Sequence, residues 1–361
     1  MYMFQNIIRN QRAFTSDSSM PCRQAVALSI WKVKDFSFQI LAAFILSFSL
    51  LCLFNSQALS QTEKIYDKKS ETLVLTAHPV TQFLTDYILK DTDIKSVMIQ
   101  PEGLPLLRLS SFLNGRGKKT LSELAPKAEA VITIRSLWNE DPVYAFTRRY
   151  NIRIVEIDAG RPLDGELAGI ALTDFDSTSA SKLASELKLS SPVAIKGKQA
   201  APWLSLNNLG AMADIIATDI TKLEPDSREI IAANVNKLKR ILLSIKASAE
   251  KDLARASSLS CISLSPHFNY LAADFGLDLV ATLPLGNETL DEDQAANLVS
   301  YIKTEGIALV LMDQKPEEIL KKNLQNAQIN YIVLDNIDEK TGDVLETVKN
   351  NVEKLVNGFL Q

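Results

Sequence analysis

Histidine and cysteine are scarce in this chain of 361 residues, which has two histidines and three cysteines. Only Cys261 lies beyond residue 60, so a form of the protein without the first sixty residues can make no internal disulfide bond. Cys261 stands in an apolar segment and is expected to be a small buried side chain. There is no HExxH motif, cysteine cluster or histidine-rich loop, so spacing alone gives only a weak indication of a metal site.

Other absences argue against nucleic-acid binding and catalysis. Lysine and arginine do not outnumber aspartate and glutamate, the net charge is −4, and no basic stretch is interleaved with aromatic residues. No Gly-x-Ser-x-Gly nucleophile motif is present. The segment NGRGKKT at 114–120 is similar to a phosphate-binding loop, but Phe112 stands where the first glycine is required. We therefore predict a protein that is not an enzyme and has no catalytic cofactor.

The first sixty residues differ from the rest of the chain. An apolar run without charges spans 38–54, basic residues precede it, and the small-x-small sequence Ala58-Leu59-Ser60 follows. This order is typical of a secretory signal, and it predicts a periplasmic protein with residues 1–60 as signal peptide and 61–71 as a flexible lead. The alternative is an uncleaved membrane anchor, because the run is just long enough to span a bilayer.

Beyond residue 71, short β-branched segments alternate with amphipathic ones, which predicts parallel sheets with crossover helices. One helix is expected to end at Leu223, and a second of about 30 residues to begin near Asp226, long enough to bridge two lobes. The predicted fold class is α/β, with two βα lobes of mainly parallel sheets joined by a long backbone helix. The predicted domains are an N-terminal lobe at 72–200, linking helices at 201–256 and a C-terminal lobe at 257–361. The strands are expected at 72–77, 95–100, 130–134, 152–157, 261–264, 277–283, 308–312 and 331–334.

Ligands of open α/β sheets bind beyond the carboxyl ends of the strands. The residues that follow the expected strands include both histidines of the chain, and two imidazoles with carboxylates suit zinc or a transition metal. A histidine beside a proline can equally serve only to hydrogen-bond a turn. The candidates at these strand ends are His78, Glu102, Arg135, Trp138, His267, Asp313 and Asp335.

Three pieces of the chain carry a resemblance to a known family. They are the segment APWLSL at 201–206, the long helix after Pro225, and the segment SLSPHF at 263–268. In this order they are similar to the metal-binding, cluster A-I solute-binding proteins of ABC importers. The resemblance implies capture of zinc or manganese as cargo between two lobes, delivery to a membrane permease, and a monomer. A divergent branch of this family resembles the chain further, with His-Pro, Pro-Glu-Gly, Arg-Ser-x-Trp and Pro-Trp-Leu-Ser segments.

The family's ligands are three histidines and a carboxylate, and the chain keeps few of them. Ala201 and Ser265 stand where two of the histidines are expected, and the loop of the remaining one offers Glu102. Asp335 matches the family's carboxylate, and His78 is a substitute from another strand end. The resemblance therefore implies a metal site made of His78, Glu102, His267 and Asp335.

Two alternatives remain open from the sequence. Arg135 and Trp138, with Asp313, could bind a small organic or anionic ligand on the same scaffold. Against this, Arg135 could instead pair with Glu102 or Asp158 while Trp138 packs under a loop. The other alternative is a scaffold protein that acts on a partner and binds no ligand.

Overall fold

The computed structural model describes residues 72–173, 177–189, 201–285, 289–338 and 342–361, which belong to one compact unit, Glu71–Gln361. The predicted signal or anchor and the flexible lead lie outside the described residues. None of the helices in the described ranges is long and apolar enough to cross a membrane.

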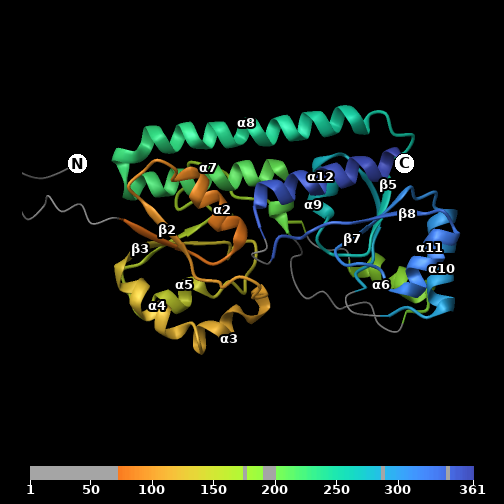
Figure 1. Ribbon diagram of the computed structural model, residues 1–361, viewed down its shortest axis with the longest axis horizontal. Helices are drawn as coiled ribbons and strands as arrows, with labels where there is room; N and C mark the ends of the chain where they lie inside the picture. Colours follow the sequence, from red (N-terminus) through yellow and green to blue (C-terminus); the bar gives the residue numbers. More distant parts are fainter. Residues whose placement is uncertain (1–71, 174–176, 190–200, 286–288, 339–341) are drawn as a thin grey trace, which may run out of the picture. The chain divides into compact units, whose positions relative to one another are not determined.

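Two four-stranded parallel sheets form the framework, and both have the same strand order (Figure 1). The first sheet has the order β2-β1-β3-β4 and the second β6-β5-β7-β8, so each sheet's first strand lies between the two that follow it in the chain. This arrangement confirms the predicted fold class. The strands are β1 (Leu73–Thr76), β2 (Lys95–Met98), β3 (Ala128–Thr133), β4 (Val155–Asp158), β5 (Ser260–Ser263), β6 (Asp278–Thr282), β7 (Leu309–Met312) and β8 (Asn330–Val333).

Helices cover both faces of the first sheet because alternate residues of its buried strands point to opposite sides. Val74 belongs to one hydrophobic cluster with helix α2 (Pro79–Ile88), whereas Leu75 belongs to another on the opposite face. The helices of the second cluster are α3 (Leu109–Asn114), α4 (Lys118–Leu124) and α5 (Val143–Thr147). The sequence predicts a helix over 121–127 but none over α3, and the structure starts α4 earlier, at Lys118.

Two helices form the link between the sheets, as predicted. Helix α7 (Leu206–Leu223) ends before a 3-10 turn at Pro225–Ser227, and α8 (Arg228–Leu253) follows. Figure 1 shows α7 and α8 side by side, with α8 extending from the first lobe to the second. Helix α8 contacts α2 of the first lobe and α12 (Val344–Leu360) of the second, so it bridges the two.

The second lobe includes a helix from the segment 159–200, for which the sequence predicts no particular element. Helix α6 (Ser177–Glu186) contributes Leu183 and Ala184 to the cluster that contains Ile262 of β5. The chain therefore reaches the second sheet once before the linking helices, although the predicted lobe boundaries themselves stay a prediction. The other helices of this lobe are α9 (Asn269–Asp274), α10 (Glu292–Thr304), α11 (Glu318–Asn326) and α12.

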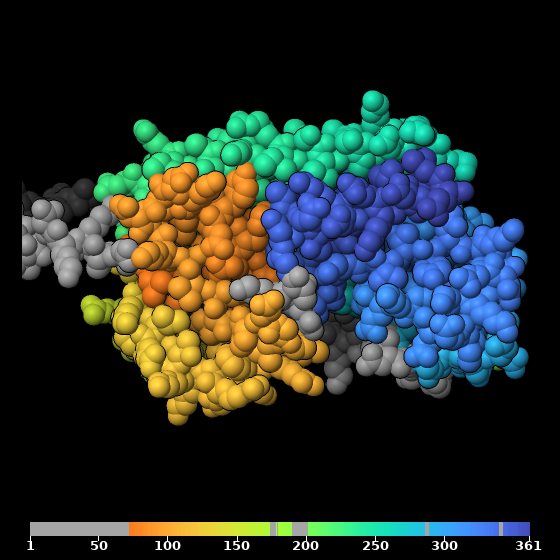
Figure 2. All heavy atoms as spheres, viewed as in Figure 1, coloured from red at the N-terminus to blue at the C-terminus, as the bar shows by residue number. Residues whose placement is uncertain are grey.

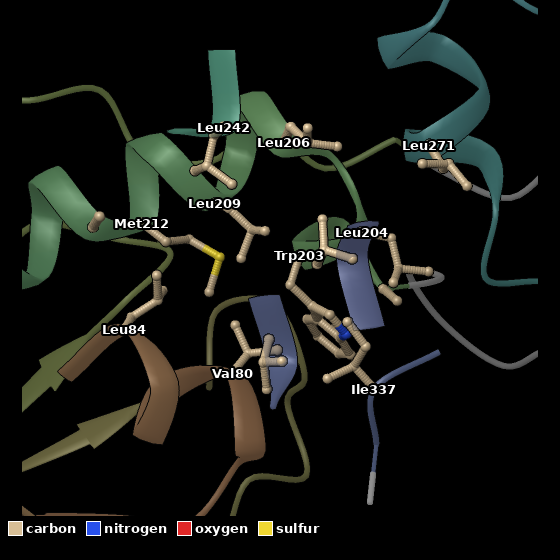
Figure 3. Close-up of a cluster of buried hydrophobic side chains, with 14 of the residues drawn as sticks. Val80, Leu84, Trp203, Leu204, Leu206, Leu209, Met212, Leu242, Leu271 and Ile337 are labelled. Carbon is tan, nitrogen blue, oxygen red and sulfur yellow. The ribbon is translucent and has the colours of Figure 1, made fainter. Parts of the chain in front are cut away.

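A single hydrophobic cluster continues through both lobes and the linking helices. Figure 3 shows the indole of Trp203, at the start of the link, between Val80 of α2 and Ile337 of the loop that follows β8. The indole Nε1–H donates a hydrogen bond of 2.9 Å to the backbone oxygen of Asn336. Both lobes therefore pack against one buried aromatic side chain. Its ring stabilises the contact by burying apolar area, and its N–H adds a hydrogen bond of fixed direction.

A second contact between the link and the C-terminal lobe is ionic. The Asp274 carboxylate at the end of α9 accepts hydrogen bonds from the backbone N–H groups of Leu206 and Asn207, at the start of α7. The ammonium of Lys246 in α8 lies 3.0 Å from the same carboxylate. Because this carboxylate caps α7 and pairs with a lysine of α8, it fixes the positions of α7, α8 and α9 relative to one another.

We expect Asp274→Ala to lower the free energy of unfolding by about 2 kcal/mol, because it removes the cap of α7 and one of the two carboxylates that pair with Lys246. Urea unfolding at neutral pH measures the change. The control is Asp252→Ala, which breaks an exposed pair with Arg255 of 3.5 Å and should cost less than about 0.5 kcal/mol. Equal losses in the two variants would contradict a structural role for Asp274.

Candidate functional site

The loops that follow β5 and β7 meet at the carboxyl edge of the second sheet. Since β5 lies between β6 and β7, this edge is the point where the strand order reverses, which is where such sheets bind ligands. After β5 the chain turns through Ser265, whose hydroxyl accepts a hydrogen bond of 3.3 Å from the His267 backbone N–H. Asp313 follows β7 directly. The fold thus brings His267 and Asp313 together from neighbouring strands.

His267 faces carboxylates and keeps partial contact with solvent. Its Nε2 lies 3.8 Å from Oδ2 of Asp313, and 31% of its side chain is exposed. Burial lowers the pKa of His267, while the negative charges of Asp313 and Asp338 oppose this shift. A neutral imidazole beside carboxylates has the lone pair that a divalent cation requires.

Asp338 is a member of this group that the sequence reasoning missed. Burial raises the pKa of Asp338, and the nearby His267 opposes the shift. Asp338 lies five residues beyond the end of β8. The strand-end rule selects only the first polar residue after a strand, which here is Asp335. The repeated carboxylate in the segment DNID at 335–338 is the signal that could have identified it.

Asp335 has a structural role in the same loop. Its Oδ1 accepts a hydrogen bond of 2.8 Å from the Ile337 backbone N–H, and Asn351 of α12 bonds both its backbone N–H and its carbonyl. This turn holds Ile337 at a φ of 58°, a left-handed conformation that is rare for a β-branched residue. The strained backbone directs the Ile337 side chain into the core beside Trp203 (Figure 3). Asp335 therefore shapes the loop that ends in Asp338.

His78 is the N-cap of helix α2. Its Nδ1 accepts a hydrogen bond of 3.1 Å from the Val80 backbone N–H, and its ring packs edge-to-face on Trp203 with the centroids 4.5 Å apart. Because Nδ1 is an acceptor, the proton of the neutral ring is on Nε2, which leaves no lone pair there for a metal. Burial lowers the pKa of His78 to about 3, and Nε2 has no hydrogen-bond partner among the described residues. The structure thus gives the first predicted ligand a different role.

Glu102 lies on the loop that follows β2. The residue is exposed, and the loop turns at Gly103, whose φ of 67° is one that glycine adopts without strain. Gln100 precedes this loop. It is buried and donates a hydrogen bond from Nε2 to the Leu104 backbone oxygen.

Arg135 makes contacts that satisfy much of its guanidinium. Its Nε and Nη2 donate hydrogen bonds of 2.9 and 2.6 Å to the two carboxylate oxygens of Glu156, and it lies over the ring of Tyr144. The sequence favoured Glu102 or Asp158 as the partner of Arg135, and the structure corrects this to Glu156, on the neighbouring strand β4. Trp138 is half-buried and packs against both hydrophobic clusters of the first lobe. These contacts hold Arg135 and Trp138 in the scaffold and not toward a ligand.

A buried carboxylate lies behind Arg135. Asp141 accepts hydrogen bonds of 2.9 and 3.0 Å from the backbone N–H groups of Ile134 and Val143. Burial raises its pKa to about 6, and the charges of Asp158 and Glu156 add to the shift. Asp141 therefore fixes the turn after β3 and is enclosed by the protein.

The four residues predicted as a metal shell do not assemble in this structure. In the described part of the chain, no three histidine, cysteine, aspartate or glutamate side chains are placed to share a metal ion. His78 belongs to the junction around Trp203, Glu102 is exposed on its own loop, and Asp335 holds a turn. The pair His267 and Asp313 remains, with Asp338 near enough to affect its charge.

The comparisons with known proteins identify the class of the molecule. The family model of the periplasmic component A of zinc-uptake complexes matches residues 175–358, just over half of the chain. The chain therefore belongs to this family of zinc-uptake solute-binding proteins, as the resemblance in its sequence implied. No curated protein is similar enough to count as a match.

Several solved structures have a similar fold. ZnuA has 17% identity and a TM-score of 0.57, with 80% of this chain and 99% of ZnuA covered. The Zn(II)-bound AdcA of Streptococcus pneumoniae has 18% identity and a TM-score of 0.59, with 81% of this chain and 58% of AdcA covered. A mutant of FpvC from Pseudomonas aeruginosa has 15% identity and a TM-score of 0.62, with 80% of this chain and 99% of FpvC covered. At these identities the likeness shows the fold.

The capping role of His78 predicts a pH dependence of stability. A histidine whose pKa is lowered on folding contributes stability that is complete above its unfolded pKa of about 6.5 and is lost as the pH falls toward about 3. Between pH 7.5 and pH 5 the loss should be about 2 kcal/mol. We expect His78→Asn, which can still cap α2, to remove most of this difference in urea unfolding.

The control for this experiment is His267→Asn. Neighbouring carboxylates oppose the lowering of the pKa of His267, so its removal should leave most of the pH dependence in place. The assignment would fail if His78→Asn lost as much stability between the two pH values as the unchanged protein.

Proposed function

We propose that this protein captures a divalent metal ion as cargo, at the carboxyl edge of its second sheet, for delivery to the permease of an ABC importer. The observation that carries the proposal is the imidazole of His267 beside the carboxylate of Asp313, with Asp338 close by. Membership of the zinc-uptake family supports the class of cargo. Solved structures of similar fold hold Zn(II) in AdcA and Ni²⁺ or Mn²⁺ in FpvC.

Nitrogen and carboxylate ligands decide which metal the site prefers. One neutral imidazole and two carboxylates make a mixed set that zinc accepts readily, and zinc forms stronger complexes than manganese with such ligands. We therefore propose zinc as the preferred cargo. In this proposal His267 and Asp313 supply the first two ligands and Asp338 a third, and Glu102 is retained as the predicted ligand from the first lobe.

The pKa shifts give the proposal a pH dependence. Burial raises the pKa of Asp338, so its carboxyl group holds its proton to a higher pH than an exposed aspartate does. A metal ion binds the deprotonated carboxylate and the neutral imidazole, and it must displace any protons on them. Affinity should therefore decrease as the pH falls, and binding should release protons.

The remaining functional expectations follow from the same class. A solute-binding protein that works with a permease must be outside the cytoplasm, which agrees with the predicted signal or anchor in residues 1–60. We propose a periplasmic monomer. The alternative ligand class, a small organic anion bound by Arg135 and Trp138, gains no support because Glu156 already occupies the guanidinium.

The test is calorimetry of Zn²⁺ and Mn²⁺ binding to chelator-treated residues 61–361. We expect one site for Zn²⁺ with a Kd of about 1 μM or tighter, equivalent to about 8 kcal/mol, and weaker binding of Mn²⁺. His267→Ala should weaken zinc binding by about 100-fold or more, and Asp313→Asn by about tenfold, because each removes a ligand.

His78→Asn is the matched control, since it removes the other histidine of the chain. It should change the affinity by less than about threefold. No binding by the unchanged protein would refute the metal proposal. Equal losses of zinc affinity in the two histidine variants would place the metal site at His78, beside Trp203.

A further inference from the structure

Cations gather at one edge of the first lobe. The segments 115–129 and 143–153 contain seven lysines and arginines and two glutamates, in a chain whose net charge is −4. All seven cationic side chains are exposed, and none forms an ion pair with a carboxylate among the described residues. We call this surface the basic edge; its cations are Arg116, Lys118, Lys119, Lys127, Arg148, Arg149 and Arg153.

One hydrogen bond joins the segment after α5 to the end of α3, and local contacts orient the arginines. Arg149, just beyond the end of α5, donates a hydrogen bond of 3.4 Å to the Asn114 side chain at the end of α3, and its guanidinium lies 4.1 Å from the ring centroid of Phe146. Arg148 donates a hydrogen bond of 2.8 Å to the Tyr144 hydroxyl. Aromatic rings and an amide therefore orient the arginines, and no acid among the described residues neutralises them. Figure 2 shows the segment with α3 and α4, in yellow, on the outer surface of the first lobe.

An apolar side chain projects from the same edge. Ile152 is 78% exposed and stands between Asn151 and Arg153. Among the described large hydrophobic residues only Leu107 is more exposed, at 81%, and it too precedes an arginine, Arg108. Exposed apolar side chains beside cations are typical of surfaces that rest on anionic bilayers, since the side chain enters the interface and the cation meets a phosphate.

The chain enters the fold at this edge. Asn151 donates hydrogen bonds of 3.0 and 2.8 Å to the backbone oxygens of Ala125 and Ala128, and Ala128 pairs in register with Leu73, the first residue of β1. The apolar run at 38–54, predicted as part of a signal peptide and alternatively as a membrane anchor, is separated from β1 by residues 55–72. Leu73 at the start of β1 pairs with Ala128, and Ala128 accepts a hydrogen bond from Asn151, the neighbour of Ile152. The start of β1 therefore lies close to the basic edge.

We propose that the basic edge binds the surface of an anionic phospholipid bilayer, with Ile152 inserted at the interface. The strands of a parallel sheet all point the same way, so their amino ends form this edge, and the loop with Glu102 lies beyond their carboxyl edge. Membrane contact at the basic edge leaves the opposite edge of the sheet free. The proposal does not depend on the identity of the cargo.

The test is sedimentation of residues 61–361 with vesicles of phosphatidylcholine alone or with 30% phosphatidylglycerol. This part of the chain contains the whole compact unit and lacks the apolar run at 38–54. We expect partition to the anionic vesicles in about 0.1 M salt, with loss in about 0.5 M salt because ions screen the cations. The triple variant Arg148→Glu, Arg149→Glu, Arg153→Glu should lower the partition by about tenfold or more.

Two further variants distinguish an anionic bilayer from a soluble acidic partner and from a general effect of charge. Lys237→Glu, Lys251→Glu, Lys303→Glu makes the same change in net charge at exposed positions elsewhere and should lower the partition by less than about threefold. Ile152→Ser should weaken vesicle binding severalfold and leave binding to soluble polyaspartate unchanged. Absence of binding to anionic vesicles, or equal losses in the two triple variants, would overturn the proposal. Unaltered vesicle binding by Ile152→Ser, with tight polyaspartate binding, would assign the edge to an acidic protein instead.

Discussion

The burial of one indole ring determines how the two lobes of this protein are joined. Trp203 contacts the imidazole that caps α2 on one side and the strained loop after β8 on the other. An aromatic side chain buries much apolar area, and its N–H must find an acceptor once it leaves water. The Asn336 carbonyl provides that acceptor, so the position of the β8 loop depends on the position of the indole.

The packing around Trp203 explains why the two histidines have different roles. His78 meets Trp203 within a continuous core, where a charged or metal-bound ring would need desolvation without compensating oxygen ligands. His267 occupies the corresponding strand end of the second sheet, where carboxylates accompany it and water reaches it. The two sheets have the same strand order, yet the histidine at the reversal point is enclosed in the first sheet and faces carboxylates in the second.

The sequence predicted the framework well because buried strands and long helices have strong periodic patterns. It missed α3, because six residues are too few to show a helical period. It could not place α6, because the sequence STSASKLASE has few apolar residues. The strand-end rule found His267 and Asp313 but could not distinguish a ligand from a helix cap. His78 is followed by a proline at the first helical position, and that pairing of an acceptor with Pro79 is typical of a helix start. The sequence did not identify Asp338, because its position near His267 depends on the turn at Ile337, and no local pattern predicts that turn.

The proposed cation site, whose named ligands in the second sheet all belong to one lobe, has consequences for release as well as capture. When ligands come from both lobes, binding and closure are coupled, and a ligand can shift that equilibrium only by its differential affinity for the two states. His267, Asp313 and Asp338 all belong to the second lobe, so their contribution to affinity is the same at any lobe separation. Glu102 is the predicted ligand from the first lobe, and it stands on an exposed loop outside the rigid junction. Whatever coupling exists between cargo and lobe movement must therefore pass through that loop, because the core around Trp203 already fixes the lobes to the helices that join them.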